Sequence, residues 1–297
     1  FPTNPIVTPS MDEKIGTNIN GPSLIRVPDW LPEPLGRYYL YFAHHKGKYL
    51  RLAYADRLEG PWATHGPGVL DLKDSYFANS QDGHHVASPD VHVDDDRREI
   101  RMYYHGIVPE GGQRSRVAIS NDAINFTARQ EILGNSYFRV FQYGGYHYAL
   151  GMPGHFYRSR DGLTGFEEGP VLFTKDMRHT ALKLSGDTLS VFYSNAGDKP
   201  ESILTATIDL TPDWMDWKES DPTVVLEPEM DYEGAALPLK PSARGLTTVS
   251  VRQARDLTMR LRSSSQLTDC ASLRCSPLPR ALQTANILLG QLPGLEL

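Results

Sequence analysis

Apolar and polar residues alternate along short segments of this chain, and the segments recur in a fixed order. Stretches such as Leu-Tyr-Phe-Ala at 40–43 have the period of two that half-buried strands need. Each unit contains a short apolar segment, an aromatic-rich segment, a segment that ends in a turn, and a short closing segment. The four units span residues 20–70, 87–133, 137–173 and 179–226. This order predicts the four-stranded blades of a β-propeller. A β-sandwich is the alternative, but it would not restart with the same four steps.

Four blades do not close a ring easily, so we expect a fifth. Residues 1–18, together with the chain after Glu227, are the material for it. The predicted fold is therefore all-β, a five-bladed propeller that is closed or incompletely closed. From Leu246 the strand pattern stops and apolar positions take helical spacing. We divide the chain into a propeller domain, residues 1–244, and a short helical segment, residues 245–297.

Composition narrows the classes of function. The 297 residues include 30 lysines and arginines against 36 acidic residues, a net charge of −6, so we expect no nucleic-acid partner. No apolar run approaches the roughly 18 residues of a membrane span, so we expect no membrane partner either. The 25 glycines and 22 prolines favour many tight turns over long helices. Nothing in the sequence indicates the oligomeric state.

Cysteine usage bears on the compartment. Both cysteines, Cys270 and Cys275, follow the propeller region, which excludes a disulfide scaffold or a cysteine-based zinc site within it. The chain opens at Phe1 with neither a methionine nor a leader, as a processed protein would. We expect a secreted or periplasmic protein.

The repeat pattern over residues 20–240, together with Ser-Pro-Asp-Val at 88–91, resembles the five-bladed propeller glycoside hydrolases of families 43, 62, 32 and 117. This resemblance implies that polar residues on the first strand of each blade line a central funnel, as they do in those families. Asp90 matches the blade-two aspartate that tunes the catalytic acid. Glu233, in Tyr-Glu-Gly-Ala, resembles the context of the proton donor. Asn20 stands where the blade-one base, an aspartate, is expected.

Histidines and arginines near the same strand ends are candidate sugar ligands. Imidazoles can donate hydrogen bonds to hydroxyl groups, and guanidinium groups can hold a carboxylate or sulfate. Any single histidine is as readily explained by a turn or an interface. The predicted substrate-binding residues are Asn20, His45, His85, His105, Arg139 and His179. No cofactor is required; related propellers often hold a central Ca²⁺, but no ligand spacing here demands a metal, and histidine ligates calcium poorly.

The segment from Leu246 to Leu297 resembles a fragment of the histidine phosphatases of the phosphoglycerate mutase type. The likeness rests on Cys275-Ser-Pro-Leu-Pro-Arg-Ala, where Arg280 would contact phosphate. Neither the Arg-His-Gly nucleophile motif nor a second catalytic histidine accompanies it. Without that nucleophile no phosphoenzyme forms, so phosphatase activity is not implied.

These observations predict a glycoside hydrolase that acts on an oligo- or polysaccharide, with Asp90 and Glu233 as catalytic carboxylates and a role in polysaccharide degradation. Two alternatives stay open. One is a polysaccharide lyase, or another hydrolase, that uses histidine and tyrosine. The other is a carbohydrate-binding propeller without turnover, which the asparagine at position 20 favours.

Overall fold

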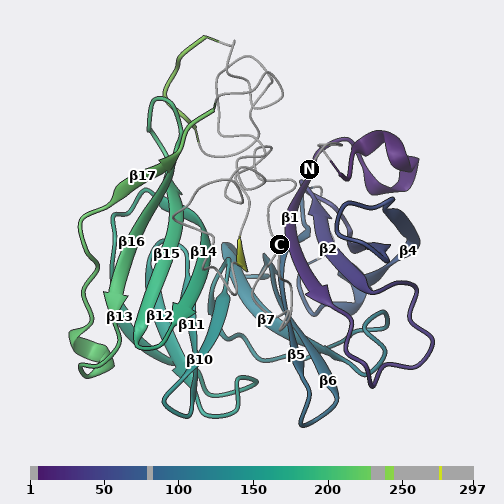
Figure 1. Ribbon diagram of the computed structural model, residues 1–297, viewed down its shortest axis with the longest axis horizontal. Helices are drawn as coiled ribbons and strands as arrows, with labels where there is room; N and C mark the ends of the chain where they lie inside the picture. Colours follow the sequence, from purple (N-terminus) through teal and green to yellow (C-terminus); the bar gives the residue numbers. More distant parts are fainter. Residues whose placement is uncertain (1–5, 79–82, 229–237, 244–273, 276–297) are drawn as a thin grey trace.

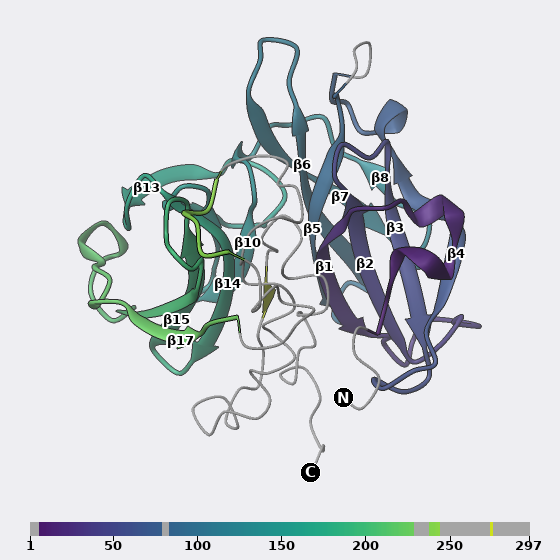
Figure 2. The same ribbon diagram turned by 90° about the horizontal axis from the view of Figure 1, so that it is seen from above.

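The computed structural model describes residues 6–78, 83–228, 238–243 and 274–275. These residues form four antiparallel sheets around a common centre, each of which meanders outward from an inner strand (Figures 1 and 2). The inner strands are β1, β5, β10 and β14, and the outer strands are β4, β8, β13 and β17. The fold is therefore an all-β propeller, as the repeat predicts.

Each blade follows the predicted four-step order. Blade 1 contains β1 Ile19–Arg26, β2 Tyr38–His44, β3 Tyr49–Ala55 and β4 Ala63–Asp71. Blade 2 contains β5 Val86–Asp94, β6 Glu99–Ile107, β7 Gln113–Ser120 and β8 Thr127–Ala128, with β9 Gly134–Asn135 also paired to β7. Blade 3 contains β10 Arg139–Tyr143, β11 Tyr146–Gly151, β12 His155–Ser159 and β13 Glu167–Val171. Blade 4 contains β14 Met177–Ser185, β15 Thr188–Asn195, β16 Ile203–Asp209 and β17 Thr223–Leu226.

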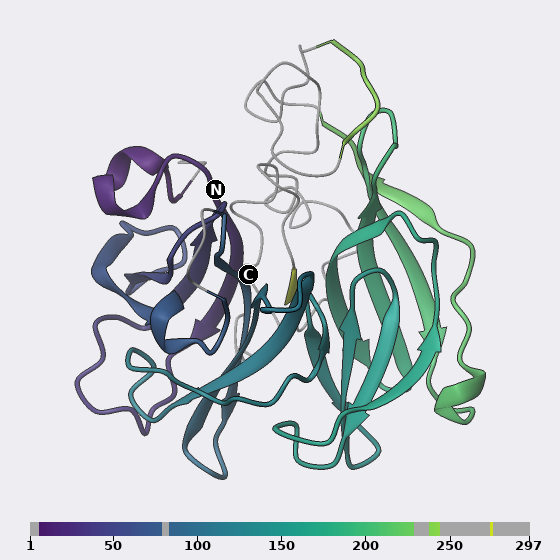
Figure 3. The same cartoon turned by 180° about the vertical axis from the view of Figure 1, so that it is seen from behind.

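The prediction of five blades is wrong for the described part of the chain, which forms four. Residues 6–18 were expected to supply a strand, but they contain two short 3-10 turns, η1 Pro9–Met11 and η2 Glu13–Ile15, beside blade 1 (Figures 1 and 3). Thr64 holds this segment by donating to Asp12 at 2.9 Å. Its apolar side chains fill the blade 1 core without the alternation that a strand would require.

Little of the predicted helical segment is described. Its described residues, Arg274–Cys275, form β18, which pairs with the inner strand β14. The remainder of residues 245–297, including Arg280, lies outside the described residues, as do the domain boundary and Glu233. Two other 3-10 turns, η3 Leu72–Asp74 and η4 Trp214–Asp216, follow β4 and β16.

Large aromatic side chains fill the space between neighbouring blades. Between blades 1 and 2, Tyr41 and Tyr104 are at most 1% exposed. The Tyr41 hydroxyl donates to the carbonyl of Ala123 at 2.8 Å, so the buried phenol keeps a hydrogen-bond partner. Burying each large apolar side chain contributes about 1.5–3 kcal/mol, which holds the sheets in place without helices. Within the described ranges, no helix is long and apolar enough to cross a bilayer.

Candidate functional site

Polar side chains from three blades meet where the inner strands begin. His85 precedes β5, His105 lies near the end of the adjacent strand β6, and His179 lies near the start of β14. The ring of Tyr137, just before β10, connects them. Its centroid lies 4.3 Å from that of His105 and 5.6 Å from that of His179. The His85 and His105 rings are 6.0 Å apart. We call this row, His85, His105, Tyr137 and His179, the hub cluster.

A bulge in three of the four inner strands helps to position these groups, whereas β10 pairs with β11 in unbroken register. The register of the inner strand against its neighbour shifts between Asn20 and Ser23 in blade 1, and between Ala87 and Asp90 in blade 2. In blade 4 the same shift lies between Arg178 and Ala181. A bulge bends the strand and redirects its side chains, and here it recurs beside the shared centre.

One residue in each of these bulges, and Tyr137 just before β10, have left-handed backbone geometry. The φ angles are +69° at Gly21, +50° at Ser88, +64° at Tyr137 and +55° at His179. Residues other than glycine seldom adopt this geometry, and such strain is concentrated at functional sites. The recurrence of this geometry therefore identifies the three inner-strand bulges, together with Tyr137 just before β10, as the candidate site.

Tyr137 was not among the predicted site residues. It is half-buried, and burial raises its pKa; a side-chain hydrogen bond with Ser88 and the charges of Arg139 and Arg178 partly oppose that rise. Its position at the start of the third unit is equivalent to Ser88 and His179, and that equivalence is the signal in the sequence that could have found it.

His105 is held in its neutral form. The side chain is 1% exposed, and its pKa lies well below the ordinary value because of burial first, then His85 and Arg139. Its Nδ1 has no hydrogen-bond partner among the described residues. A neutral imidazole can accept or donate one proton, as sugar hydroxyl groups require.

The carboxylate of Asp90 is engaged within the fold. The residue is 1% exposed, and its Oδ2 accepts hydrogen bonds from the backbone N–H of Val140 and from Nε2 of His92, both at 2.8 Å. These bonds fix the charge between blades 2 and 3. The arrangement suits a carboxylate that influences a neighbouring group more than one that must move onto a substrate.

Two buried arginines flank Tyr137. Arg139, at 0% exposure, donates from Nη1 to the carbonyl groups of Phe138 at 2.7 Å and Ser88 at 3.3 Å. Arg178 forms an ion pair with Glu201, in which Nη2 and Oε1 are 2.7 Å apart. The charge of Arg178 is therefore balanced inside blade 4.

The two predicted site residues of blade 1, Asn20 in β1 and His45 just after β2, lie close to each other. Asn20 is 7% exposed and its side chain donates to the carbonyl of Asn18 at 3.3 Å. The backbone N–H of half-buried His45 donates to the same carbonyl at 2.9 Å. The Gly21 bulge approaches the Ser88 bulge so closely that a Cβ on Gly21 would lie 2.9 Å from the Ser88 Cα. Blade 1 thus contacts blade 2 at Ser88, which in turn shares a side-chain hydrogen bond with Tyr137 of the hub cluster.

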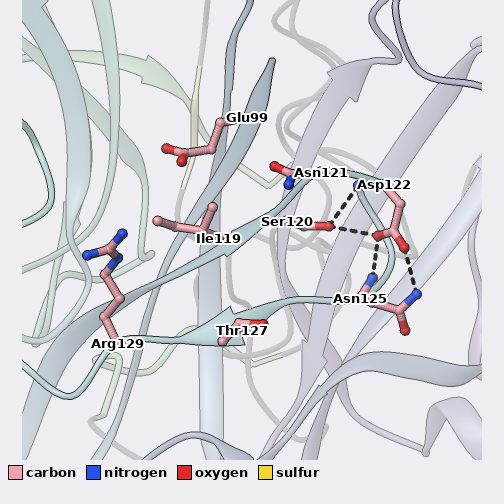
Figure 4. A pocket seen from close by; sticks show the side chains of 8 residues that line it. All are labelled: Glu99, Ile119, Ser120, Asn121, Asp122, Asn125, Thr127 and Arg129. Atoms are coloured by element: carbon pink, nitrogen blue, oxygen red, sulfur yellow. Dashed lines mark hydrogen bonds between the residues drawn. The ribbon is translucent and has the colours of Figure 1, made fainter. Parts of the chain in front are cut away.

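Two cavities lined by described residues open at the opposite end of the blades. One, of about 600 Å³, lies where β7 ends and is lined by the residues labelled in Figure 4. Asp122 there accepts hydrogen bonds from Ser120 and Asn125 (Figure 4), and these outweigh its burial and hold its pKa at about 2. The other cavity, of about 590 Å³, includes Arg26 at the end of β1. Neither contains a predicted site residue.

The hub cluster does not suit a calcium ion. In the described part of the chain, no three histidine, cysteine, aspartate or glutamate side chains come together as metal ligands. Calcium takes six to eight oxygen ligands, whereas this cluster consists mainly of imidazole rings next to arginines. We assign no chemistry to a metal.

Sequence comparison identifies a viral relative. The chain is 37% identical over 290 aligned residues to the uncharacterized protein R118 of Acanthamoeba polyphaga mimivirus, covering 86% of this chain and 82% of that protein. This chain belongs to the R118 family. No family model matches it.

Solved structures similar to this R118 family member are glycosidases of family 43. A thermostable family-43 glycoside hydrolase gives a TM-score of 0.54 at 16% identity, covering 72% of this chain and 76% of that one. CoXyl43, a β-xylosidase/α-arabinofuranosidase from a compost metagenome, gives 0.52 at 18%, covering 74% and 79%. The GH43_1 enzyme of Xanthomonas citri gives 0.52 at 15%, covering 69% and 74%. At these identities the likeness shows the fold alone, and it supports a β-propeller without supporting the expected fifth blade.

Proposed function

We propose that this protein binds a carbohydrate at the hub cluster and hydrolyses a glycosidic bond. The observation that carries the proposal is the gathering of Tyr137, His105 and His179, from three neighbouring blades, at the end of the propeller where the inner strands begin. A fold shared with family-43 glycosidases supports it. Aromatic rings and neutral imidazoles offer a sugar both a stacking face and hydrogen-bond partners.

In this proposal two carboxylic groups carry the reaction. Glu233 donates a proton to the leaving oxygen as water attacks the sugar. Asp90 supplies a fixed negative charge near the positive charge that develops on the ring, because Val140 and His92 hold it in place. Asn20, His45, His85, His105, Arg139 and His179 orient the sugar. An asparagine at position 20 cannot act as a base, so the attacking water needs another acceptor for its proton.

The test measures release of reducing sugar from a panel of glycans. Asp90→Asn keeps an oxygen that can accept from Val140 but removes the charge, and Glu233→Gln removes the proton donor. We expect each change to reduce turnover about 100-fold or more. Glu168→Gln, on the exposed outer strand β13, is the matched control and should keep full activity. If turnover survives both site changes, the roles assigned to Asp90 and Glu233 are wrong.

Tyr137 favours a second candidate, a polysaccharide lyase. A tyrosine between two histidines and near two arginines suits β-elimination on a uronic acid. In that reaction a base removes the proton at C5, the bond from C4 to the glycosidic oxygen breaks, a C4–C5 double bond forms, and the departing oxygen takes a proton. Tyr137→Phe keeps the ring and removes the hydroxyl group. An ultraviolet-absorbing product that Tyr137→Phe abolishes would select the lyase over the hydrolase.

Asn20 favours a third candidate, sugar binding without turnover. Its amide stands at the bulge of blade 1, where the resemblance leads one to expect the aspartate that serves as base. Calorimetry that shows binding of a glycan which is never cleaved would select this candidate.

A further inference from the structure

We propose that the turn between β2 and β3, together with the segment that leads into β5, binds the anionic group of an acidic glycan, a carboxylate or a sulfate. We call residues 44–51 and 83–86 the cationic rim. The inference rests on the proposed function only in placing a glycan at the neighbouring hub cluster. It adds the class of sugar that the site selects.

The cationic rim is locally basic in an acidic protein. Residues 44–51 contain no aspartate or glutamate, although the chain carries a net charge of −6. Within this short stretch Lys46, Lys48 and Arg51 carry positive charge, and His44 and His45 lie beside them. Charge concentrated in this way creates a local positive potential that attracts an anion, whatever the net charge of the protein.

Arg51 is the buried member of the rim. It is 5% exposed, and no described carboxylate forms an ion pair with it. Its Nη1 donates to the carbonyl of Tyr49 at 2.6 Å, and the guanidinium lies 3.9 Å from the centroid of the Tyr49 ring. Its Nε has no partner in the described residues. A buried cation without an acidic partner is costly, so an anion at this position would satisfy a need that the fold leaves open.

The two segments of the rim touch each other. Lys48 Nζ donates to the carbonyl of His84 at 2.9 Å, and the backbone N–H of Val86 donates to the carbonyl of Gly47 at 3.1 Å. The tip of Arg51 lies beneath the turn, where a Cβ on Gly47 would come within 2.9 Å of its Nη1. The turn, the buried arginine and the segment before β5 therefore form one surface.

Two rim histidines lie close enough to these cations for their pKa values to be affected. Burial lowers the pKa of His85, and although its hydrogen bond to Gly83 opposes this, Lys46, Lys48 and His84 lower it further. Burial and then Arg51 lower the pKa of His44 in the same direction. In both histidines the effect of nearby cations adds to that of burial.

The rim adjoins the hub cluster through His85. Its ring belongs to the rim and lies 6.0 Å from that of His105, which continues to Tyr137. One glycan can thus place an acidic sugar on the rim and the next sugars against the hub rings. An acidic residue also lies near the rim, because the Tyr49 hydroxyl donates to the carbonyl of Lys14, two residues after Asp12. The carboxylate of Asp12 already accepts hydrogen bonds from Thr64 and from the Lys14 N–H.

The experiment measures binding by calorimetry on the full chain at low and at physiological salt. Polygalacturonate tests a carboxylate, dextran sulfate tests a sulfate, and dextran is the neutral probe. Lys46→Glu reverses an exposed rim charge and should not disturb the fold. Lys218→Glu makes the same charge change on exposed Lys218, after η4 in blade 4, and is the matched control. Arg51→Gln tests the buried member, with circular dichroism to check folding.

We expect an acidic glycan to bind, dextran not to bind, and Lys46→Glu to weaken affinity about tenfold at low salt. Lys218→Glu should change it less than about twofold. Equal losses in the two lysine variants, or equal binding of dextran and the acidic glycans, would overturn the proposal. If the protein cleaves a neutral glycan but binds no acidic glycan, the role proposed for the cationic rim is wrong and the proposed hydrolase activity stands. If the protein binds an acidic glycan but cleaves no glycan, the rim proposal stands and the proposed hydrolase activity is wrong.

Discussion

The Oδ2 atom of Asp90 lies 2.8 Å from the backbone nitrogen of Val140, and this hydrogen bond ties blade 2 to blade 3. The equivalent bond between blades 1 and 2 runs from the N–H of Val91 to the hydroxyl oxygen of Ser23, at 2.9 Å. In both, a side chain just after a bulge accepts from the next inner strand. The blades are therefore joined by polar contacts at the centre as well as by aromatic contacts farther out.

Truncating these side chains should loosen the ring. We expect Asp90→Ala to destabilise the protein by about 2–3 kcal/mol, because it leaves the N–H of Val140 buried without its charged partner. Ser23→Ala should cost about 1 kcal/mol. Asp90→Asn should cost less than Asp90→Ala, since its amide oxygen can still accept. Urea unfolding measures all three. An Asp90→Ala cost no larger than that of Ser23→Ala would show that the charge adds nothing.

The left-handed geometry at Gly21 makes a second prediction. With φ at +69° and the Ser88 Cα so near, Gly21→Ala should destabilise by about 1–2 kcal/mol. Gly66→Ala is the matched control, because a Cβ there would meet only Lys14 Nζ, at 3.9 Å. It should change stability by less than about 0.5 kcal/mol. Equal effects of the two changes would show that the bulge does not require glycine.

The strands of the fold could be predicted from local pattern. The alternating stretch Leu-Tyr-Phe-Ala at 40–43 lies in β2, Tyr38–His44, because alternation reports directly on a strand. The fifth blade was expected without such alternation. Ile6, Val7 and Ile15 are buried in the blade 1 core, but they lie around 3-10 turns and not in a strand. Apolar residues indicate burial, and only their spacing indicates a strand.

The candidate site was predicted in part. The rings of His85 and His105 are neighbours, and Tyr137 connects His105 to His179, because these strand ends share one end of the propeller. Tyr137 was missed, since a tyrosine with positive φ has no signature in sequence. The engagement of Asp90 was also missed, because its partner, a backbone N–H of another blade, leaves no trace in side-chain composition.

The ion pair between Arg178 and Glu201 supplies a third prediction. Nε and Nη2 of Arg178 both donate to Glu201 Oε1, and Ser194 donates to the same oxygen at 2.9 Å. Because Glu201→Gln leaves a buried guanidinium unbalanced, it should destabilise by about 3–5 kcal/mol. The double change of both residues to methionine should cost less than Glu201→Gln alone.

An exposed ion pair in blade 3 serves as the control for that measurement. Glu167 pairs with Arg158 at 3.1 Å, with a Glu167 side chain that is 66% exposed. Glu167→Gln should therefore cost less than about 1 kcal/mol. Comparable losses for Glu167→Gln and Glu201→Gln would contradict the role assigned to burial.

His105 should make the protein lose stability in mild acid. Its pKa in the folded protein lies well below the ordinary 6.5, chiefly because of burial, so below pH 6.5 the unfolded chain binds a proton that the folded protein does not. The free energy of unfolding is therefore unaffected by His105 well above pH 6.5 and falls as the pH drops below it, with a slope of up to about 1.4 kcal/mol per pH unit for this one proton. Urea unfolding at pH 7.5, 6.5 and 5.5 measures the slope. His105→Gln should reduce it without abolishing it, because the pKa values of His44 and His85 are also lowered by burial. An unchanged slope in His105→Gln would mean that His105 takes up its proton in the folded protein, and that the hub cluster carries a charge at pH 5.5.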